Sequence, residues 1–365
     1  MIGATAFDSA AMARAMRLAE RGRYRAHPNP MVGCVLARDG NIVGEGWHAV
    51  AGEAHAEINA LRAAGDRARG ATVYVTLEPC AHHGKTPPCA KALVEAGVAE
   101  VIMAMLDPYP AVRGRGRAIL DAAGITTRVG LMQQAAADLN RGFLSRVERG
   151  RPWLTLKLAS SLDGATAMHD GESQWITGPE ARADVQRLRA RSGAVLTGIG
   201  TVLADDPSLT VRDASIDTGG RQPLRVVLDS ALRMPIAASM LAMPGETLVY
   251  CGDDSAREML VSGGAEVVRT DGAGGWVEPV AVLEDLASRE INTVLVEAGP
   301  VLCGSLIRAK LVDELVIYQA PHIMGSETRR LFETPAWTRL ADRQGLRIVE
   351  VRQIGGDLRI IARPS

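Results

Sequence analysis

The residues best suited to chemistry lie between positions 55 and 89. His55 and Glu57 are separated by one alanine, Pro79-Cys80 follows after a strand-like run, and Cys89 comes nine positions after Cys80. One imidazole and two thiolates suit Zn²⁺, and three protein ligands leave the fourth tetrahedral position for water. Zinc lowers the pKa of such a water to about 7, which provides hydroxide at neutral pH. The spacing therefore predicts a catalytic zinc site with the ligands His55, Cys80 and Cys89.

Glu57 is the acid that this chemistry needs beside the metal. It can take a proton from the water and return it to the ring nitrogen and the leaving amine. His55 and Glu57 fit the first turn of a helix, because residues two apart in a helix interior point about 200° away from each other. His-x-Glu with Pro-Cys and a second Cys is the signature of zinc nucleobase deaminases, here stretched by AHHGKTPP (81–88).

Two alternatives to this interpretation remain open. A closed structural zinc site, or buried thiols without any metal, would also explain the cysteines. His82 and His83 are further candidate ligands. We favour them as loop residues, because a fourth protein ligand would displace the water.

The elements that must position these residues alternate between strands and helices. Strand-like runs at 31–37 and 41–47 flank Asp39-Gly40, which is a hairpin signal. After them we expect a helix at 55–64, a strand at 72–78, a helix at 89–97 and a strand at 101–106. The second half has strand-like runs at 153–160, 194–200, 224–230, 247–252 and 292–300, with helices at 180–192 and 302–311. This alternation predicts an α/β fold for each half. We expect domains at 1–146 and 151–365, with a polar, basic boundary at 145–152.

Composition limits the partners and the compartment. The chain has 365 residues, 47% of them hydrophobic, and a formal net charge of -1, so no overall basic field exists to hold nucleic acid. The N-terminal run is laced with charged residues, unlike a signal peptide, and no window is long and apolar enough to span a membrane. Five cysteines are too few and odd in number for a disulfide framework. We expect a cytoplasmic protein with no nucleic-acid or membrane partner.

The first half resembles a known family in three segments. HPNPMVGCVL (27–36), GWHAVAGEAHAE (46–57) and TLEPCAHHGKTPPC (76–89) are similar to the deaminase half of the bifunctional riboflavin-biosynthesis enzymes. The resemblance implies a cytidine-deaminase-like three-layer α/β/α fold and hydrolytic deamination of 2,5-diamino-6-(5-phosphoribosylamino)pyrimidin-4-one, a phosphorylated pyrimidine. It also implies that Asn29 contacts the pyrimidine. The candidates for holding the ribose phosphate are His48, His82, Lys85 and Thr86. The alternative for each of them is that it is a solvated loop residue without a binding role.

The second half resembles the reductase half of the same enzymes, whose fold is like that of dihydrofolate reductase. The similar segments are LKLASSLDG (156–164), GESQWITG (171–178), TGIGTVLADDPSLTVR (197–212) and VEAGPVLCGSL (296–306). The last two place glycines and free backbone N–H groups at strand-to-helix turns, where phosphates bind, although turn glycines also serve packing alone. The resemblance implies NADPH-dependent reduction of the ribosyl group of 5-amino-6-(5-phosphoribosylamino)uracil to a ribityl chain.

The same resemblance assigns two sets of residues in the second half. Those expected to line the NADPH site are Ala159, Trp175, Thr201, Asp205, Ser230, Gly299, Pro300, Val301, Leu302, Cys303, Gly304 and Ser305. Those expected to bind the substrate are Ser173, Arg189, Leu209, Arg212 and Glu297. The two arginines suit a phosphate through bidentate geometry, with a surface ion pair as the alternative. Lys157 and Glu297 are both candidates for the proton donor in the reduction.

Several features depart from the family pattern or leave the function open. Tyr109 stands where the resemblance leads us to expect asparagine, which affects the loop contacts in the first half. Ala165 stands where many relatives carry a basic residue, so the preference for NADPH over NADH follows from the resemblance alone. One alternative is a zinc deaminase for another nucleobase with a non-catalytic, nucleotide-binding second half. Another is a zinc-stabilised binding module without turnover. An exposed sheet edge in either half could pair subunits into a homo-oligomer.

Overall fold

Two compact units make up the chain. The computed structural model describes residues 4–81, 88–110, 112–270 and 272–365, and the chain divides into unit 1, Met1–Gly150, and unit 2, Arg151–Ser365. Helix α6 (Arg141–Arg149) runs through most of the polar stretch that the sequence indicates as a boundary. Within the described residues, no helix is both long enough and apolar enough to cross a membrane.

Unit 1 is built on a five-stranded sheet with the strand order β2-β1-β3-β4-β5. Its strands are β1 (Gly33–Arg38), β2 (Asn41–Trp47), β3 (Thr72–Val75), β4 (Glu100–Met103) and β5 (Thr126–Val129). Its other helices are α1 (Ala6–Ala19), α2 (Ala56–Ala64), α3 (Cys89–Ala96), α4 (Arg115–Ala122) and α5 (Gln133–Leu139), with short 3₁₀ turns at Glu20–Gly22 and Gly65–Ala68. Strands β1 and β2 are antiparallel, whereas β3, β4 and β5 are parallel to one another.

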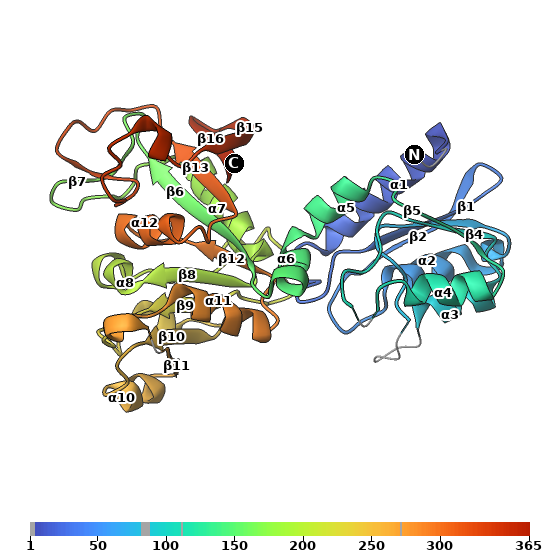
Figure 1. The fold of residues 1–365 in the computed structure, drawn as a ribbon, viewed down its shortest axis with the longest axis horizontal. Helices are drawn as coiled ribbons and strands as arrows, with labels where there is room; N and C mark the ends of the chain where they lie inside the picture. The colour runs from blue at the N-terminus through green and yellow to red at the C-terminus, as the bar shows by residue number, and fades with distance from the viewer. Residues whose placement is uncertain (1–3, 82–87, 111, 271) are drawn as a thin grey trace. The chain divides into compact units, whose positions relative to one another are not determined.

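Helices cover both faces of this sheet (Figure 1). Helices α1 and α5 pack on one face through a core that includes Met12, Leu18 and Ala136. Helices α2, α3 and α4 pack on the other face, with Ala60 and Leu93 in the core. Burial of apolar side chains on both faces drives this layering. The three-layer α/β/α fold expected from the resemblance is therefore confirmed.

The β1–β2 hairpin determines how closely the first ligand-bearing helix approaches the sheet. Asp39 and Gly40 form the predicted turn, with φ angles of 50° and 76°. Gly44 and Gly46 lie in β2 beneath helix α2. A Cβ atom at Gly46 would come within 2.3 Å of the Ala56 carbonyl oxygen, and one at Gly44 within 2.4 Å of the Ala60 carbonyl oxygen. Only glycine lets the backbones approach this closely, and the start of α2 is fixed as a result.

Unit 2 is built on a nine-stranded sheet with the order β11-β10-β9-β8-β12-β6-β13-β16-β15, and β7 pairs with β14 in a small second sheet. Its strands are β6 (Trp153–Ser160), β7 (Ala165–Met168), β8 (Ala194–Gly198), β9 (Leu224–Leu228), β10 (Thr247–Cys251), β11 (Glu266–Arg269), β12 (Thr293–Val296), β13 (Glu314–Gln319), β14 (Thr328–Arg330), β15 (Leu346–Ile354) and β16 (Asp357–Pro364). Its helices are α7 (Pro179–Arg191), α8 (Ile199–Asp205), α9 (Ser239–Ala242), α10 (Arg257–Ser262), α11 (Pro279–Ser288) and α12 (Pro300–Arg308), with 3₁₀ turns at Ala273–Gly275 and Leu340–Asp342.

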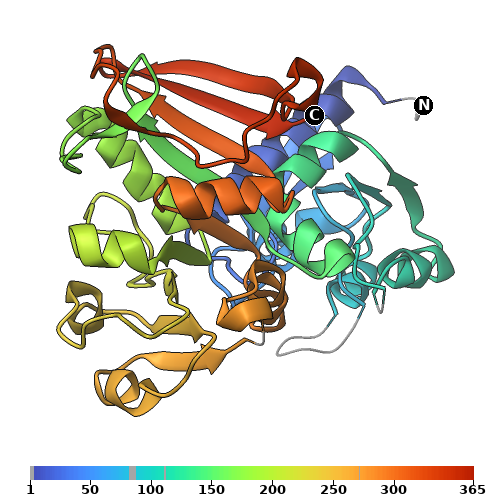
Figure 2. The same ribbon diagram turned by 60° about the vertical axis from the view of Figure 1, so that its left-hand side comes forward.

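The large sheet of unit 2 also has a core on each face. Helices α11 and α12 pack on one face, and α7, α8 and α10 pack on the other; Figure 2 shows α12 lying across the first of these faces. The strands from β11 to β13 are parallel, and only β16 and β15 run antiparallel at one end. The carboxyl ends of the parallel strands therefore meet at one edge, where ligands of α/β folds bind.

Candidate active sites

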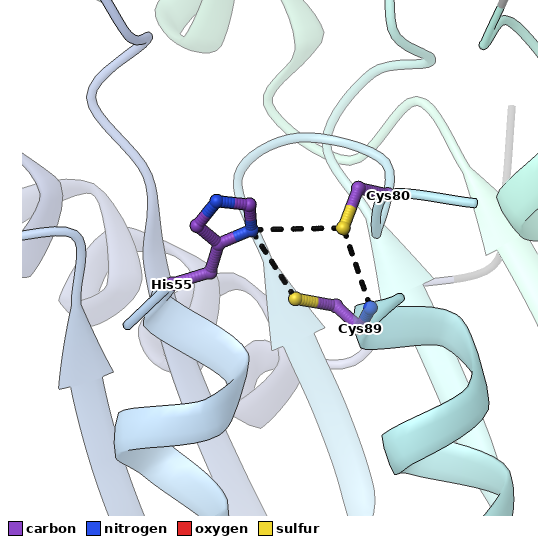
Figure 3. A group of neighbouring side chains, drawn as sticks. All are labelled: His55, Cys80 and Cys89. Carbon is purple, nitrogen blue, oxygen red and sulfur yellow. Dashed lines mark hydrogen bonds between the residues drawn. The ribbon is translucent and has the colours of Figure 1, made fainter. Parts of the chain in front are cut away.

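Three side chains converge in unit 1 to form a metal-binding group. The Nδ1 atom of His55 lies 3.6 Å from Sγ of Cys80 and 3.3 Å from Sγ of Cys89. All three ligand atoms lie within 4.8 Å of one another. Figure 3 shows the imidazole and the two sulfurs pointing toward one another from the start of α2, the loop after β3 and the start of α3. The sequence separates these residues by up to 34 positions, and the sheet brings them together.

Local structure explains why each ligand faces the group. His55 is the extended residue just before α2, with φ -71° and ψ 165°, and Glu57 lies in the first turn of that helix. Cys89 is the first residue of α3. Its backbone N–H donates to Sγ of Cys80 at 3.3 Å, which points the Cys80 thiolate toward the helix start. A helix N-terminus favours thiolate over thiol, and such anionic sulfurs bind a cation.

The donor set and its spacing fit zinc. In a tetrahedral zinc site a nitrogen ligand and a sulfur ligand lie about 3.6 Å apart, given the usual bond lengths, close to the 3.3 and 3.6 Å found here. The hydrogen bond from the Cys89 thiol holds the pKa of Cys80 below its ordinary value, against the opposing effect of burial. Three ligands from the described residues leave one tetrahedral position for water, as a catalytic site requires.

Glu57 lies beside this group and is almost fully buried, with 3% of its surface exposed. Burial raises the pKa of its carboxyl to about 7, and the charge of the nearby Cys80 acts in the same direction. A carboxyl with a pKa near neutrality can both accept and return a proton. The position and the environment of Glu57 therefore suit proton transfer next to the metal.

Asn29 and His48 lie next to the ligand group and bind each other. The amide nitrogen of Asn29 is 3.1 Å from Nε2 of His48, and Nδ1 of His48 is 3.3 Å from the carbonyl oxygen of Ala54. The His48 ring also meets the ring of His55 edge to face, with centroids 5.3 Å apart. His48 is 2% exposed, so both of its ring nitrogens are used inside the protein. The candidates Lys85, Thr86 and His82 lie outside the described residues, and so does His83.

In unit 2, three charged residues meet beside the middle of β6 and the carboxyl end of β12. The guanidinium of Arg189, on α7, donates to both carboxylate oxygens of Glu297 at 2.6 and 3.0 Å and to the carbonyl of Thr210 at 3.0 Å. Nζ of Lys157, on β6, lies 3.8 Å from the same carboxylate. The bidentate fork that the sequence suggests for a phosphate is thus occupied by Glu297 in this structure.

The charges of this cluster determine its protonation. Burial alone would raise the pKa of Glu297, but the positive charges of Arg189 and Lys157 outweigh it and lower the pKa to about 2. Burial lowers the pKa of Lys157, and Glu297 offsets part of this effect. Glu297 is therefore a carboxylate at neutral pH and has no proton to donate.

The two strand-to-helix turns that the sequence analysis predicts to bind phosphates are neighbours in the structure. A Cβ atom at Gly299, before α12, would contact Oγ1 of Thr201 on α8 at 4.0 Å, and one at Gly198, before α8, would contact Leu302 at 3.3 Å. The turns after β12 and β8 are therefore adjacent. Gly299 caps α12 without a side-chain hydrogen bond, so the first N–H groups of this nine-residue helix have no side-chain acceptor at the cap.

Unpartnered hydroxyls lie near the same edge. Oγ of Ser160, at the end of β6, and Oγ1 of Thr197, near the end of β8, are buried and have no hydrogen-bond partner among the described residues. Buried polar atoms without partners are rare in folded proteins. Together with the free helix start, they fit a dinucleotide cofactor lying across the strand ends.

The remaining residues assigned to the α12 turn differ in what they face. Val301 is 64% exposed at the helix start, next to Pro300. Cys303 is buried, and its thiol donates to the Ala298 carbonyl. A Cβ atom at Gly304 would come within 1.9 Å of the Glu333 carbonyl, so packing explains this glycine. The first residues of segment 299–305 therefore lie at the turn, whereas Cys303 and Gly304 pack against other residues of unit 2.

The other predicted NADPH residues lie on several elements of unit 2. Ala159 precedes the last residue of β6, and Asp205 is the last residue of α8. Ser230 follows β9, and its Oγ accepts the backbone N–H of Val277 at 3.1 Å. Trp175 is exposed, and the Arg182 guanidinium lies 4.6 Å from the centroid of its ring. Ser305, in α12, is half-buried.

The predicted substrate segment 209–212 is held by side chains that the sequence analysis did not single out. The amide of Gln222 pairs with both the N–H and the carbonyl of Val211, at 2.8 and 3.1 Å, and Gln186 accepts the N–H of Arg212 at 2.8 Å. Leu209 is buried and has a positive φ of 49°. Arg212 itself is exposed, and Ser173 is half-buried in the loop before α7. A constrained segment thus presents Arg212 to solvent.

A cavity of about 1120 Å³ in unit 2 lies elsewhere. It is lined by residues such as Lys310, Arg330, Phe332 and Trp337, and none of the predicted reductase residues contributes to its wall. The residues predicted for the reductase site therefore lie outside the wall of this cavity.

Sequence reasoning missed one buried residue of the metal region. Glu78 is 3% exposed and accepts three backbone hydrogen bonds from the segment after β4. The signal available in the sequence was an acidic residue two positions before Cys80, at the end of an apolar strand.

Comparison with known proteins agrees with this division of the chain. Residues 5–105 match the family described as the cytidine and deoxycytidylate deaminase zinc-binding region, and residues 152–360 match the RibD C-terminal domain. The chain is 50% identical to the riboflavin biosynthesis protein RibD of Escherichia coli K12 over 363 residues, covering 96% of this chain and 98% of the relative. It is 46% identical to the RibD of Haemophilus influenzae, covering 98% of each.

Solved structures give the same result. RibD of Acinetobacter baumannii, form 1, is 43% identical, with a TM-score of 0.92 over 98% of this chain and 99% of that one. A Thermotoga maritima protein titled as a diaminohydroxyphosphoribosylaminopyrimidine deaminase/5-amino-6-(5-phosphoribosylamino)uracil reductase is 32% identical, with a TM-score of 0.86 over 98% and 99% of the two chains. The chain therefore belongs to the RibD family of riboflavin-biosynthesis enzymes, with a deaminase-type zinc-binding region in unit 1 and a RibD C-terminal domain in unit 2.

Proposed function

We propose that this bifunctional enzyme first deaminates 2,5-diamino-6-(5-phosphoribosylamino)pyrimidin-4-one in unit 1. Unit 2 then reduces the ribosyl group of the resulting 5-amino-6-(5-phosphoribosylamino)uracil with NADPH. The observation that carries the proposal is the group of His55, Cys80 and Cys89 beside a buried Glu57, in one chain with a RibD C-terminal domain.

The metal ligands in this proposal are His55, Cys80 and Cys89, and the cation is zinc. When bound, zinc supplies the Lewis acidity that activates water at neutral pH. The carboxylate of Glu57 takes one proton from the attacking water and delivers it to the pyrimidine ring nitrogen. It then takes the second proton from the hydroxyl group just added to the ring and delivers it to the amine, which leaves as ammonia. Because Glu57 is buried, bulk water does not compete for this proton.

Asn29 is the proposed contact to the pyrimidine. Its amide nitrogen donates to Nε2 of His48, and the other side of the His48 ring faces the Ala54 carbonyl. This chain of hydrogen bonds leaves the Asn29 carbonyl oxygen to accept from the substrate. His48 thereby orients Asn29, and the proposed phosphate contacts are Lys85 and Thr86.

In unit 2 the proposed cofactor region is the pair of turns before α8 and α12, and the proposed substrate contacts are Ser173, Arg189, Leu209, Arg212 and Glu297. When bound, NADPH supplies the hydride that reduces the sugar carbon. Arg189 holds Glu297 and the Thr210 carbonyl in place. Since Glu297 is ionised at neutral pH, Nζ of Lys157 is the proton donor of the two candidates.

Self-association and a cytoplasmic location complete the proposal. Strand β15 is the edge of the large sheet, and its exposed side chains include Leu346, Ile348 and Val351. An unpaired apolar edge favours pairing with a second copy. All five cysteines are free thiols, which suits a reducing compartment. Analytical ultracentrifugation of the wild-type chain and of an Ile348→Lys variant tests the pairing, and a monomeric wild type would contradict it.

The experiment that tests the two activities follows them separately. Purified protein is incubated with zinc, NADPH and the diaminopyrimidinone phosphate, and ammonia release and NADPH oxidation are recorded. We expect both signals, and Glu57→Gln should abolish the first while the protein keeps its zinc. Cytidine and adenosine-containing RNA serve as competing substrates. Faster ammonia release from either of them would overturn the substrate assignment.

A further inference from the structure

Glu78 connects the metal region to a distant part of unit 1. It lies two residues before Cys80, and its carboxylate accepts three backbone N–H groups. Oε2 accepts from Asp107 at 3.1 Å and from Gly114 at 2.9 Å, and Oε1 accepts from Arg117 at 3.0 Å. Both carboxylate oxygens are thus used, in a side chain that is almost fully buried.

All three donors belong to the segment that leads from β4 into α4. Gly114 is the N-cap residue of α4 and, having no side chain, gives the helix no side-chain capping hydrogen bond. The first N–H groups of a helix need acceptors and favour a negative charge. Glu78 supplies both from another part of the chain. The start of α4 is therefore tied to the residues that lead to Cys80.

The backbone makes a second contact at the same place. A Cβ atom at Gly116 would come within 2.0 Å of the Pro79 carbonyl oxygen and within 3.2 Å of Cγ of Glu78. Gly116 therefore lies directly against the Glu78-Pro79 peptide. The Glu78 carboxylate and the Pro79 backbone, immediately before Cys80, thus both contact the start of α4.

We propose that Glu78 is a positioning residue of the metal centre, which fixes the direction of the chain at Cys80 by binding the backbone N–H groups of Asp107, Gly114 and Arg117. The proposal rests on the proposed function, because it takes Cys80 as a zinc ligand. Cys80 is held on its other side by the N–H of Cys89. Without the Glu78 contacts, Cys80 would keep its contacts with His55 and with the N–H groups of Cys89 and Ala90. The chain that leads to it would be less restrained, which would widen the range of positions of the sulfur.

Glu78→Gln is the informative change because it keeps the size of the side chain. A glutamine presents one carbonyl oxygen and one NH₂ group, and the NH₂ group can only donate. With three backbone donors at the site, at least one N–H group loses its acceptor. Loss of a contact that orients a metal ligand typically weakens metal binding about 10–100-fold. We expect zinc loss from Glu78→Gln to be faster by about that factor.

The test uses the full chain, first loaded with Co²⁺ and then with Zn²⁺. Cobalt gives absorption bands from its bonds to thiolate sulfur, so a displaced Cys80 changes the spectrum. Zinc loss is timed by transfer to a coloured chelator. The control is Glu100→Gln, which removes the same charge from the first residue of β4, where Glu100 binds Arg128 at 2.7 and 3.3 Å. We expect an altered spectrum and faster zinc loss in Glu78→Gln only.

A second variant keeps the proposal testable if Glu78→Gln does not fold. Gly116→Ala leaves Glu78 intact and pushes α4 away from Pro79, so it should also change the cobalt spectrum and speed zinc loss. If Glu78→Gln folds, a wild-type cobalt spectrum and a wild-type rate of zinc loss would overturn the positioning role. If only Gly116→Ala folds, the same result in that variant would overturn it. Either result would leave the proposed function standing. A wild-type chain that binds neither cobalt nor zinc would instead overturn the metal centre itself.

Discussion

The buried ion pair of unit 2 gives the prediction with the largest expected effect on stability. Glu297→Gln removes the charge that receives two hydrogen bonds from Arg189. The pKa of Glu297 falls from its ordinary 4.5 to about 2 in the folded protein. At about 1.4 kcal/mol per pH unit, this difference corresponds to about 3 kcal/mol. The variant also leaves a buried guanidinium without its carboxylate, which typically costs about 3–5 kcal/mol. We expect the free energy of unfolding of unit 2 to fall by about 3 kcal/mol or more at pH 7.

The same pair predicts a pH dependence with a defined sign. A carboxyl whose pKa is lower in the folded state stabilises the protein fully above its unfolded pKa, here 4.5, and loses this contribution as the pH falls toward about 2. Between about pH 5 and about pH 3, which covers the upper part of this window, the wild type should therefore lose more stability than Glu297→Gln.

Urea unfolding followed by tryptophan fluorescence measures both effects, since Trp153, Trp175, Trp276 and Trp337 report on unit 2. The control is Glu266→Gln, which also breaks a bidentate pair with an arginine, Arg289, but with a Glu266 side chain that is 55% exposed. An exposed pair contributes about 1 kcal/mol or less. Equal losses in the two variants, or equal slopes below pH 5, would refute the reasoning.

Three further predictions follow from the sites. Glu57→Gln should lower the rate of ammonia release at least about 100-fold while zinc content by atomic absorption stays at the wild-type level; loss of zinc would contradict the role in proton transfer. Lys157→Gln should lower NADPH oxidation at saturating substrate by about 10-fold or more, with the Kd for NADPH from fluorescence titration nearly unchanged; a raised Kd with an unchanged kcat would contradict a proton donor. Gly304→Ala should lower the Tm of unit 2, because its Cβ would meet the Glu333 carbonyl at 1.9 Å, and an unchanged Tm would show that the segment yields.

Patterns of residues within one element predicted much of the first site. His55 and Glu57 lie at the start of a helix as their spacing requires, and Asp39-Gly40 forms the hairpin turn. The strand predictions ran too far at their carboxyl ends. The run 72–78 ends as a strand at Val75, and 292–300 ends at Val296. The residues beyond each strand still look apolar or extended in the sequence, yet they include Glu78 and Glu297.

Contacts between distant elements could not be read from the sequence. Arg189 and Glu297 are 108 positions apart, and each alone resembles a surface charge or a ligand contact. Glu78 is explained only by donors 29 to 39 positions later. Strands β13, β15 and β16 were not predicted. In β15 eight of nine residues are exposed, so no alternation of burial selects one face. Composition and periodicity describe single elements, whereas these features depend on which elements become neighbours.

The two glycines beneath helix α2 constrain how the metal region can vary. At Gly44 and Gly46 the obstacle to substitution is the first carbon of any side chain, which would meet a backbone carbonyl at 2.4 or 2.3 Å. Alanine and tryptophan meet this obstacle alike, because both have a Cβ atom. The cost of a substitution at these positions therefore does not depend mainly on the size of the new side chain. A replacement would lift the whole helix and carry His55 with it. Other positions around the metal can change by small increments in side-chain size. At these two positions the smallest possible replacement, alanine, already meets the full backbone clash.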